Sequence, residues 1–164
     1  MKNYNFRVWL KYEKKLLYFD KKSSFDYYFL NFNSKFVLCK YDELYNNYFE
    51  DKDIIVMEDI GLKDRNNNLI YLGDIIKKSY YNGFVYLYIT YFQLKPVAIV
   101  IPELPYEYVI FTKHTCLNDG TDIHYYDVYQ CETYDLEIVG NIFESKELIK
   151  KSKLLQKFRK QLKL

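Results

Sequence analysis

The feature that most constrains the fold of this chain is a wealth of aromatic residues combined with a near absence of alanine. Of 164 residues, 20 are Tyr, 12 are Phe and one is Trp, whereas Ala98 is the only alanine. Aromatic side chains are enriched in β-strands, and alanine is the best helix former. The sequence therefore predicts a mainly β fold, and its length suits one domain with a sizeable core.

Short strand-like runs are spread along most of the chain and are separated by turn-forming residues. They cover residues 5–10, 15–19, 36–38, 54–59, 69–71, 75–78, 84–92, 97–101, 106–112, 125–131 and 136–143. Asp64 to Asn68 is typical of a tight turn, because Asn and Asp tolerate positive φ. Residues 23–48 lack a clear period, and we interpret them as irregular, with a short helical turn near 41–48. We expect a mixed β-barrel or strongly bent sheet, SH3-like in part, over residues 1–143, with an irregular aromatic and acidic insertion at about 20–53.

Residues 144–164 change from strand to helix periodicity. Leu148, Leu155, Phe158 and Leu162 form one apolar stripe, and Ser145 precedes it as an expected N-cap. The segment holds seven Lys and one Arg against two Glu, a net charge of +6, so the other residues of this +2 chain sum to −4. The sequence predicts a basic amphipathic C-terminal helix as a separate element.

An acidic stretch lies in the amino-terminal third. Between Asp42 and Asp59 the chain has seven acidic residues and one lysine. Its residues Glu50, Asp51 and Asp53 are candidates for binding a positively charged partner surface.

The sequence favours a cytoplasmic protein without membrane contact. Residues 1–19 are interrupted by basic side chains and lack the apolar core of a signal peptide. The longest nearly apolar run, residues 84–92, is too short to span a bilayer as a helix. Three cysteines form an odd set without the spacing of a disulfide framework.

No sequence motif in the chain indicates a particular chemical reaction. Its five glycines form neither a phosphate-binding loop nor a nucleophile elbow. His114, Cys116, His124 and Cys131 are zinc-ligand types, but they lack the close pairs typical of zinc sites. We favour a strand-end histidine and buried cysteines, and expect no catalytic residue, metal or cofactor.

Two surfaces are candidates for binding a partner. In the strand at 84–92, Val85, Leu87 and Ile89 alternate with Tyr86 and Tyr88; the aliphatic face suits the core, which leaves an aromatic face for interaction. The basic helix has three alternatives: docking on its own domain, contacting phosphates of a nucleic acid, or binding another protein or a second copy of this chain. The candidate residues of the helix are Lys153, Lys157, Lys160, Leu155 and Phe158.

Three segments, in this order, resemble the YopX family of small proteins from phages and prophages of low-GC bacteria. They are Phe6-Arg7-Val8-Trp9, the run from Val56 to Lys77 that contains Gly61-Leu62-Lys63-Asp64 and Gly73-Asp74-Ile75, and the run Glu137-Ile138-Val139-Gly140-Asn141-Ile142-Phe143-Glu144. Departures from the family pattern include Lys11, Asn68, Leu72 and the tail from Lys151 onward.

The resemblance implies a β-rich, barrel-like fold and a home in a mobile genetic element, and it brings no catalytic residues. It favours a non-enzymatic accessory protein that binds a host or phage protein. An anti-defence inhibitor, for example of a host nuclease complex, is one such role, and a nucleic-acid-binding module is the alternative. These segments have an architectural interpretation that needs no ligand. Gly61, Gly73 and Gly140 suit turns or bulges, and the Asp64 turn sets a hairpin register. Asp74 can bond to backbone N–H groups in a turn, and we expect Trp9 in the core.

Overall fold

The chain divides into two compact units, Met1–Asp59 and Ile60–Leu164. The structure is a computed structural model. It describes the backbone of residues 5–19, 27–32, 35–40, 47–49, 53–80, 83–92, 95–102, 104, 113–116, 122–127, 129 and 133–164. It describes side chains over residues 5–19, 53–79, 83–91, 95–102, 104, 123–127, 129 and 134–164. The C-terminal helices belong to the second unit.

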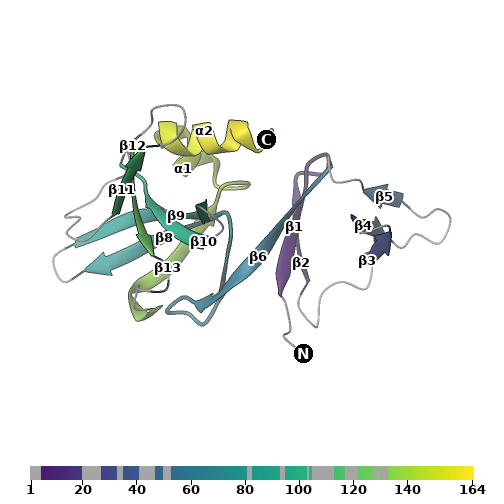
Figure 1. Cartoon of the computed structure of the whole chain (residues 1–164), viewed down its shortest axis with the longest axis horizontal. Helices are drawn as coiled ribbons and strands as arrows, with labels where there is room; N and C mark the ends of the chain where they lie inside the picture. The colour runs from purple at the N-terminus through teal and green to yellow at the C-terminus, as the bar shows by residue number, and fades with distance from the viewer. Residues whose placement is uncertain are drawn as a thin grey trace. The chain divides into compact units, whose positions relative to one another are not determined.

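The first unit contains an antiparallel sheet with β1 (Phe6–Leu10) at its centre (Figure 1). Strand β1 pairs with β2 (Lys15–Phe19) on one side and with β6 (Ile54–Lys63) on the other. Val8, Leu10 and Ile54 form a buried cluster on this sheet, and Trp9 is 4% exposed. The predicted core position of Trp9 is confirmed. Strand β6 continues beyond Asp59, and its neighbour on the far side is β7 (Leu69–Tyr71).

A second antiparallel sheet of the first unit corrects the interpretation of residues 23–48. Strands β3 (Tyr27–Phe32), β4 (Lys35–Lys40) and β5 (Asn47–Phe49) pair in that order. This stretch therefore contains paired strands, although its closely spaced aromatic residues obscure the alternation that is typical of a strand. Of the helical turn expected near 41–48, the last two residues lie in β5, and residues 41–46 lie outside the described residues.

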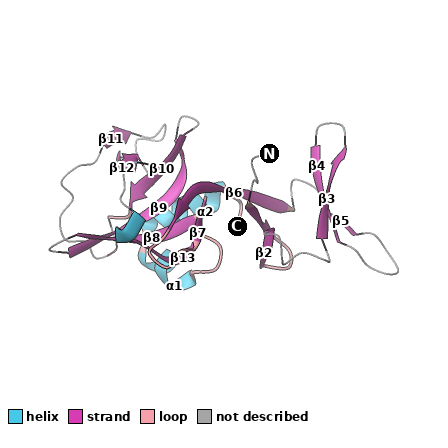
Figure 2. Ribbon diagram, turned by 90° about the horizontal axis from the view of Figure 1, so that it is seen from below, coloured by secondary structure: helices cyan, strands magenta, loops and turns pink. Residues whose placement is uncertain are grey.

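The second unit is built on a six-stranded antiparallel sheet that curls into a half-barrel (Figure 2). In spatial order its strands are β11 (Lys113–Cys116), β12 (Asp122–Asp127), β10 (Lys95–Val100), β9 (Gly83–Phe92), β8 (Asp74–Tyr80) and β13 (Leu136–Asn141). A 3-10 turn, η2 (Thr133–Asp135), precedes β13. The expected mainly β fold with a bent sheet and a helical C-terminus is confirmed.

One face of this sheet carries the main core of the unit. Val85, Leu87 and Ile89 are at most 1% exposed, so the predicted aliphatic face of β9 is confirmed. They pack in one cluster with Ile76 and Ala98 from the neighbouring strands and with further residues on the same face. The expected strand at 106–112 lies outside the described residues.

The two longer family-like segments meet at the pairing of β8 with β13. Asp74 lies opposite Asn141, and Ile75 lies opposite Gly140 at a register shift that forms a bulge. The Gly73 carbonyl accepts a 2.8 Å bond from the N–H of Ile142. The predicted use of Gly140 at a bulge is therefore confirmed. Both segments contribute strands and hydrogen bonds to the same part of the sheet.

No helix of the described part of the chain has the length and apolarity needed to cross a bilayer.

Candidate partner-binding site

Two short helices replace the single C-terminal helix expected from the sequence. Helix α1 spans Lys146–Lys151 and α2 spans Lys153–Gln161, with Ser152 between them in an extended conformation. The Ser152 N–H donates to the carbonyl of Ile149 and its hydroxyl accepts from Leu155 N–H at 3.1 Å, so one residue ends α1 and caps α2. The predicted cap, Ser145, makes no side-chain cap bond and instead accepts from the N–H of Asn141.

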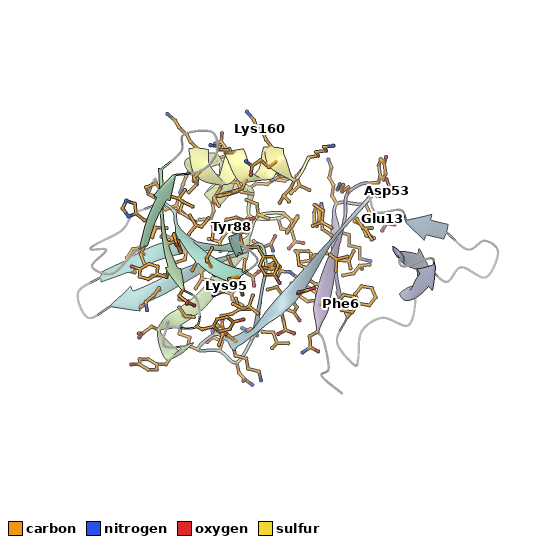
Figure 3. All side chains as sticks on the ribbon, in the orientation of Figure 1. Phe6, Glu13, Asp53, Tyr88, Lys95 and Lys160 are labelled. Atoms are coloured by element: carbon orange, nitrogen blue, oxygen red, sulfur yellow. The ribbon has the colours of Figure 1, made fainter. Side chains whose placement is uncertain are left out.

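Two residues of the apolar stripe, Leu155 and Phe158, are buried within the second unit, whereas Leu148 and Leu162 are half-buried. Leu155 is 0% exposed and Phe158 is 9% exposed, and the Phe158 ring lies 5.0 Å from that of Tyr88 on β9. Figure 3 shows Tyr88 beneath the helices, on the sheet. Leu155, Phe158 and Tyr88 are thus buried within the second unit, and the Phe158 and Tyr88 rings contact each other.

The outward side of the helices is strongly basic. Its exposed lysines are Lys146, Lys150, Lys151, Lys153, Lys160 and Lys163. Lys157 and Arg159 are half-buried. Lys160 points away from the sheet in Figure 3. We call these eight residues the basic face.

A surface ion pair partly offsets the basic face. Lys150 Nζ lies 3.0 Å from Glu147 Oε1, and its hydrogen bond and charge lower the pKa of that carboxyl. Both side chains are exposed, so the pair adds little to stability. Helix α2 contains no acidic residue that could pair with its own lysines. The net charge of the face therefore stays positive.

Phe84 and Tyr86 on β9 are half-buried, and Tyr91 is exposed. Phe84 and Tyr86 contact edge to face with ring centroids 5.6 Å apart, and Lys77 Nζ lies 4.2 Å from the Phe84 centroid. Tyr86 is half-buried, whereas Tyr88 is buried.

The acidic candidates belong to the first unit. Asp53 lies in the turn before β6, where it is half-buried and its carbonyl accepts from Lys11 N–H at 3.0 Å. Glu50 and Asp51 lie outside the described residues. The lysine candidates are thus grouped on α2, whereas Asp53 belongs to a different unit.

Buried polar side chains in the second unit serve the backbone. Asp64, 5% exposed, accepts from the N–H groups of Asn66 and Asn68 in its own turn and from Ile138 N–H on β13. Asp74 Oδ2 accepts from Tyr71 N–H at 2.8 Å, as the sequence predicted.

The charge state of Asp64 follows from these bonds. Burial alone raises the pKa of this carboxyl, but the hydrogen bonds that it accepts outweigh burial, so its pKa lies below the ordinary value. Sequence reasoning found the turn but missed the bond to Ile138, because nothing local marks a partner 74 residues away.

Among the side chains that the structure describes, no group of three or more His, Cys, Asp or Glu residues is placed to hold a metal ion. Cys131 lies outside the described residues, and Cys39 lies on β4 of the first unit.

Comparison with known proteins adds a family and a fold. The family model described as YopX protein matches residues 5–150. No curated protein matches the chain. The crystal structure of protein yopX from Bacillus subtilis is 12% identical with a TM-score of 0.56, over 90% of this chain and 98% of that chain. Protein EF1440 from Enterococcus faecalis is 20% identical with a TM-score of 0.46, over 89% and 97%.

Proposed function

Since this chain belongs to the YopX protein family, we propose that it is a non-enzymatic binding protein whose basic face contacts an acidic surface of another protein. The observation that carries the proposal is that the C-terminal helices bury apolar side chains on one side and expose lysines on the other. Leu155 and Phe158 of their apolar stripe are buried, with Phe158 against Tyr88 of the sheet, while six lysines of the segment remain exposed.

Electrostatics supports a charged partner rather than an apolar one. With Leu155 and Phe158 buried, the helices offer little exposed apolar area to drive association. Complementary charge steers encounter and excludes wrong partners, so a lysine-rich surface favours a partner with clustered carboxylates. Lysine carries a point charge and lacks the bidentate geometry with which arginine reads bases, which favours a protein over a specific DNA site.

The buried polar side chains also support a binding role rather than catalysis, because they bond to the backbone. Asp64, Asp74 and Ser152 each accept a bond from a backbone N–H and thereby hold a turn or a helix end. A carboxylate engaged in this way serves the fold, whereas a catalytic acid or base must reach a substrate.

We place this activity in a phage or prophage, where the protein acts on a host or phage protein. Inhibition of a host defence system, such as a nuclease complex with an acidic surface, is the form that we put forward. The sequence-derived expectation of a cytoplasmic setting belongs to this proposal, because such partners are found in the bacterial cytoplasm.

The test is affinity capture from a nuclease-treated host lysate with a triple charge reversal, Lys153→Glu, Lys157→Glu and Lys160→Glu. A matched control reverses three lysines outside the helices, Lys14, Lys15 and Lys95, which are exposed. We expect wild type and control to retain a protein at stoichiometric level, identified by mass spectrometry. The helix variant should weaken its binding at least about tenfold, because facing like charges cost several kcal/mol.

A nucleic acid as the true partner would give a different result. Wild type would then shift labelled duplex DNA with a steep salt dependence, and the triple reversal would reduce the slope of log K against log salt by about three. That outcome, or the absence of any stoichiometric protein, overturns the proposal.

A further inference from the structure

A half-buried lysine on β8, Lys77, has no acidic partner in the described part of the chain. In the register of the sheet, Lys77 lies between Glu137 on β13 and Tyr86 on β9, directly opposite both. The Glu137 carboxylate pairs elsewhere, since its Oε2 lies 2.7 Å from Arg65 Nη2. The Lys77 ammonium lies over the Phe84 ring, 4.2 Å from its centroid. A ring attracts a cation but leaves its charge in place, so Lys77 stays available to an anion.

Two aromatic side chains form a wall beside this ammonium. Phe84 and Tyr86 stand on the same face of β9, because successive residues of a strand alternate, and their rings contact edge to face at 5.6 Å. The Tyr86 hydroxyl has no hydrogen-bond partner among the described residues. Directly opposite positions have Cβ atoms about 4.5–5.5 Å apart, so Lys77 and Tyr86 present two donors close to one another.

The wall lies beside the part of the sheet that α2 covers. Tyr88, two residues along the same face of β9, is 4% exposed and contacts Phe158 of α2 (Figure 3). Tyr86, Phe84 and Lys77 are half-buried, so solvent reaches them. Positions two apart along a strand are separated by roughly 6.8 Å. The wall therefore begins close to the helix that carries Lys residues of the basic face.

The chemistry of this surface suits a carboxylate side chain of a protein. A carboxylate accepts charge-assisted hydrogen bonds, and both an ammonium and a phenol hydroxyl donate them. The CH₂ groups of a Glu or Asp side chain fit against aromatic rings, whereas a bare phosphate gains nothing from them. Arg65 offsets the charge of Glu137, so these two side chains and Lys77 carry a net charge of +1. Aromatic residues are also enriched in protein interfaces.

We propose that Lys77 and Tyr86 form an anchoring point for a carboxylate side chain of the acidic protein partner, with Phe84 as its apolar wall. This inference rests on the proposed function, because it assigns a second contact to the same partner. The basic face supplies charge, and the anchoring point adds donors held by paired strands. A partner that places a Glu or Asp at this point is favoured over other acidic surfaces, which gives specificity.

The first test is an NMR titration of the ¹⁵N-labelled full-length protein with a synthetic peptide of six glutamates. We expect the amide signals of Lys77 and Tyr86 to shift together with those of α2. Lys77→Met keeps an apolar stem over Phe84 and removes the charge, so the shifts on β8 and β9 should be lost. Inorganic phosphate at equal ionic strength serves as the comparison and should leave these signals in place.

The second test repeats the capture from nuclease-treated host lysate with single variants. Lys77→Met and Tyr86→Phe should each weaken binding of the captured protein about tenfold, because each removes a hydrogen bond to a charged group. Lys77→Arg should retain binding, since it keeps the charge. The matched controls are Lys95→Met and Tyr129→Phe, at exposed positions of the same unit, which should bind as wild type does.

The outcomes separate this inference from the proposed function. Weak capture by the triple reversal on α2 with full capture by Lys77→Met and Tyr86→Phe overturns the anchoring point alone. A wild type that captures no protein overturns the proposed function, and the peptide titration then decides the anchoring point. Shifts confined to α2, or equal shifts with phosphate, contradict it. If Lys77→Met alters the circular dichroism spectrum, Tyr86→Phe, which removes one oxygen atom, provides the decisive comparison.

Discussion

The Asp64 carboxylate accepts several backbone hydrogen bonds in the second unit. Its Oδ1 accepts from Asn66 and Asn68 N–H, and its Oδ2 accepts from Ile138 N–H at 3.2 Å. One carboxylate thus fixes the turn between β6 and β7 and links that turn to β13. Arg65 adds to the same link through a 2.7 Å ion pair with Glu137 on β13.

Asp64→Asn should lower the free energy of unfolding by roughly 1–3 kcal/mol at neutral pH, because one oxygen becomes an NH₂ group that faces a backbone donor. The pKa of Asp64 in the folded chain lies below its unfolded value, so its stabilisation is present above the unfolded pKa and is lost as pH falls through the folded pKa. Urea unfolding from pH 7 to pH 2 should show the gap between wild type and variant narrowing at low pH. Asp127→Asn is the control, and a gap of constant size would contradict this account.

Gly140 is required because of its neighbour rather than its backbone angle. A Cβ built on Gly140 would meet the Ser145 hydroxyl and lie 2.9 Å from Ser145 Cβ. That hydroxyl also accepts from Asn141 N–H at 2.9 Å, so it has little freedom to move. Gly61 differs, since its φ is +76° and a Cβ there would meet nothing within 4 Å.

Gly140→Ala should cost about 1–3 kcal/mol of unfolding free energy through overpacking. Adding Ser145→Gly removes the atoms in conflict, so the double variant should be more stable than the sum of the two single changes predicts. Thermal unfolding of the four proteins in the cycle measures this coupling. Simple additivity would show that the close approach is not the cause.

At the scale of elements, the C-terminal helices are part of the second unit. Leu154, Leu155 and Phe158 are at most 9% exposed, and Tyr88 contacts Phe158. The Gln156 side chain donates to the carbonyls of Ile149 and Lys150, which joins α2 to α1. The expectation that the β domain folds without the tail loses support from this burial.

Truncation after Lys150 should therefore unfold the second unit or strongly lower its stability. The three lost apolar side chains contribute roughly 1.5–3 kcal/mol each, which together rivals the about 5–15 kcal/mol that stabilises a whole domain. Full-length Lys153→Glu with Lys160→Glu, at exposed positions, should unfold within about 0.5 kcal/mol of wild type. Circular dichroism during urea unfolding compares the three proteins. A truncated chain with the wild-type midpoint would mean that the tail is a separable appendage.

At the scale of the whole molecule, two separate buried clusters stand out among the described residues, and charge is distributed unevenly along the chain. The cluster of Val8, Leu10 and Ile54 and the larger cluster around Ile89 share no residue. The last 21 residues carry a net charge of +6, and the rest of the chain carries −4. Membership of the YopX protein family covers residues 5–150, so the family match spans parts of both units and ends within α1.

The sequence by itself determined the features that depend on neighbours along the chain. Alternation in residues 84–92 identified Val85, Leu87 and Ile89 as core, because a strand presents every second residue to one face. The turn at Asp64–Asn68 followed from the positive φ that Asn tolerates, and Asn67 has φ +67°. The strands at 27–32 and 47–49 escaped prediction because aromatic residues stand at consecutive positions there and mask the period, whereas the strand expected at 36–38 lies within β4.

Only the tertiary structure decided the features that depend on segments far apart. An apolar stripe has the same sequence pattern whether it packs on its own sheet or on a partner. The 5.0 Å contact between the rings of Tyr88 and Phe158 shows that this stripe packs on its own sheet. The bond from Ile138 to Asp64 and the pairing of His114 with His124 depend on strand register. Register is set by how strands pair in space, and local residue preferences alone do not specify it.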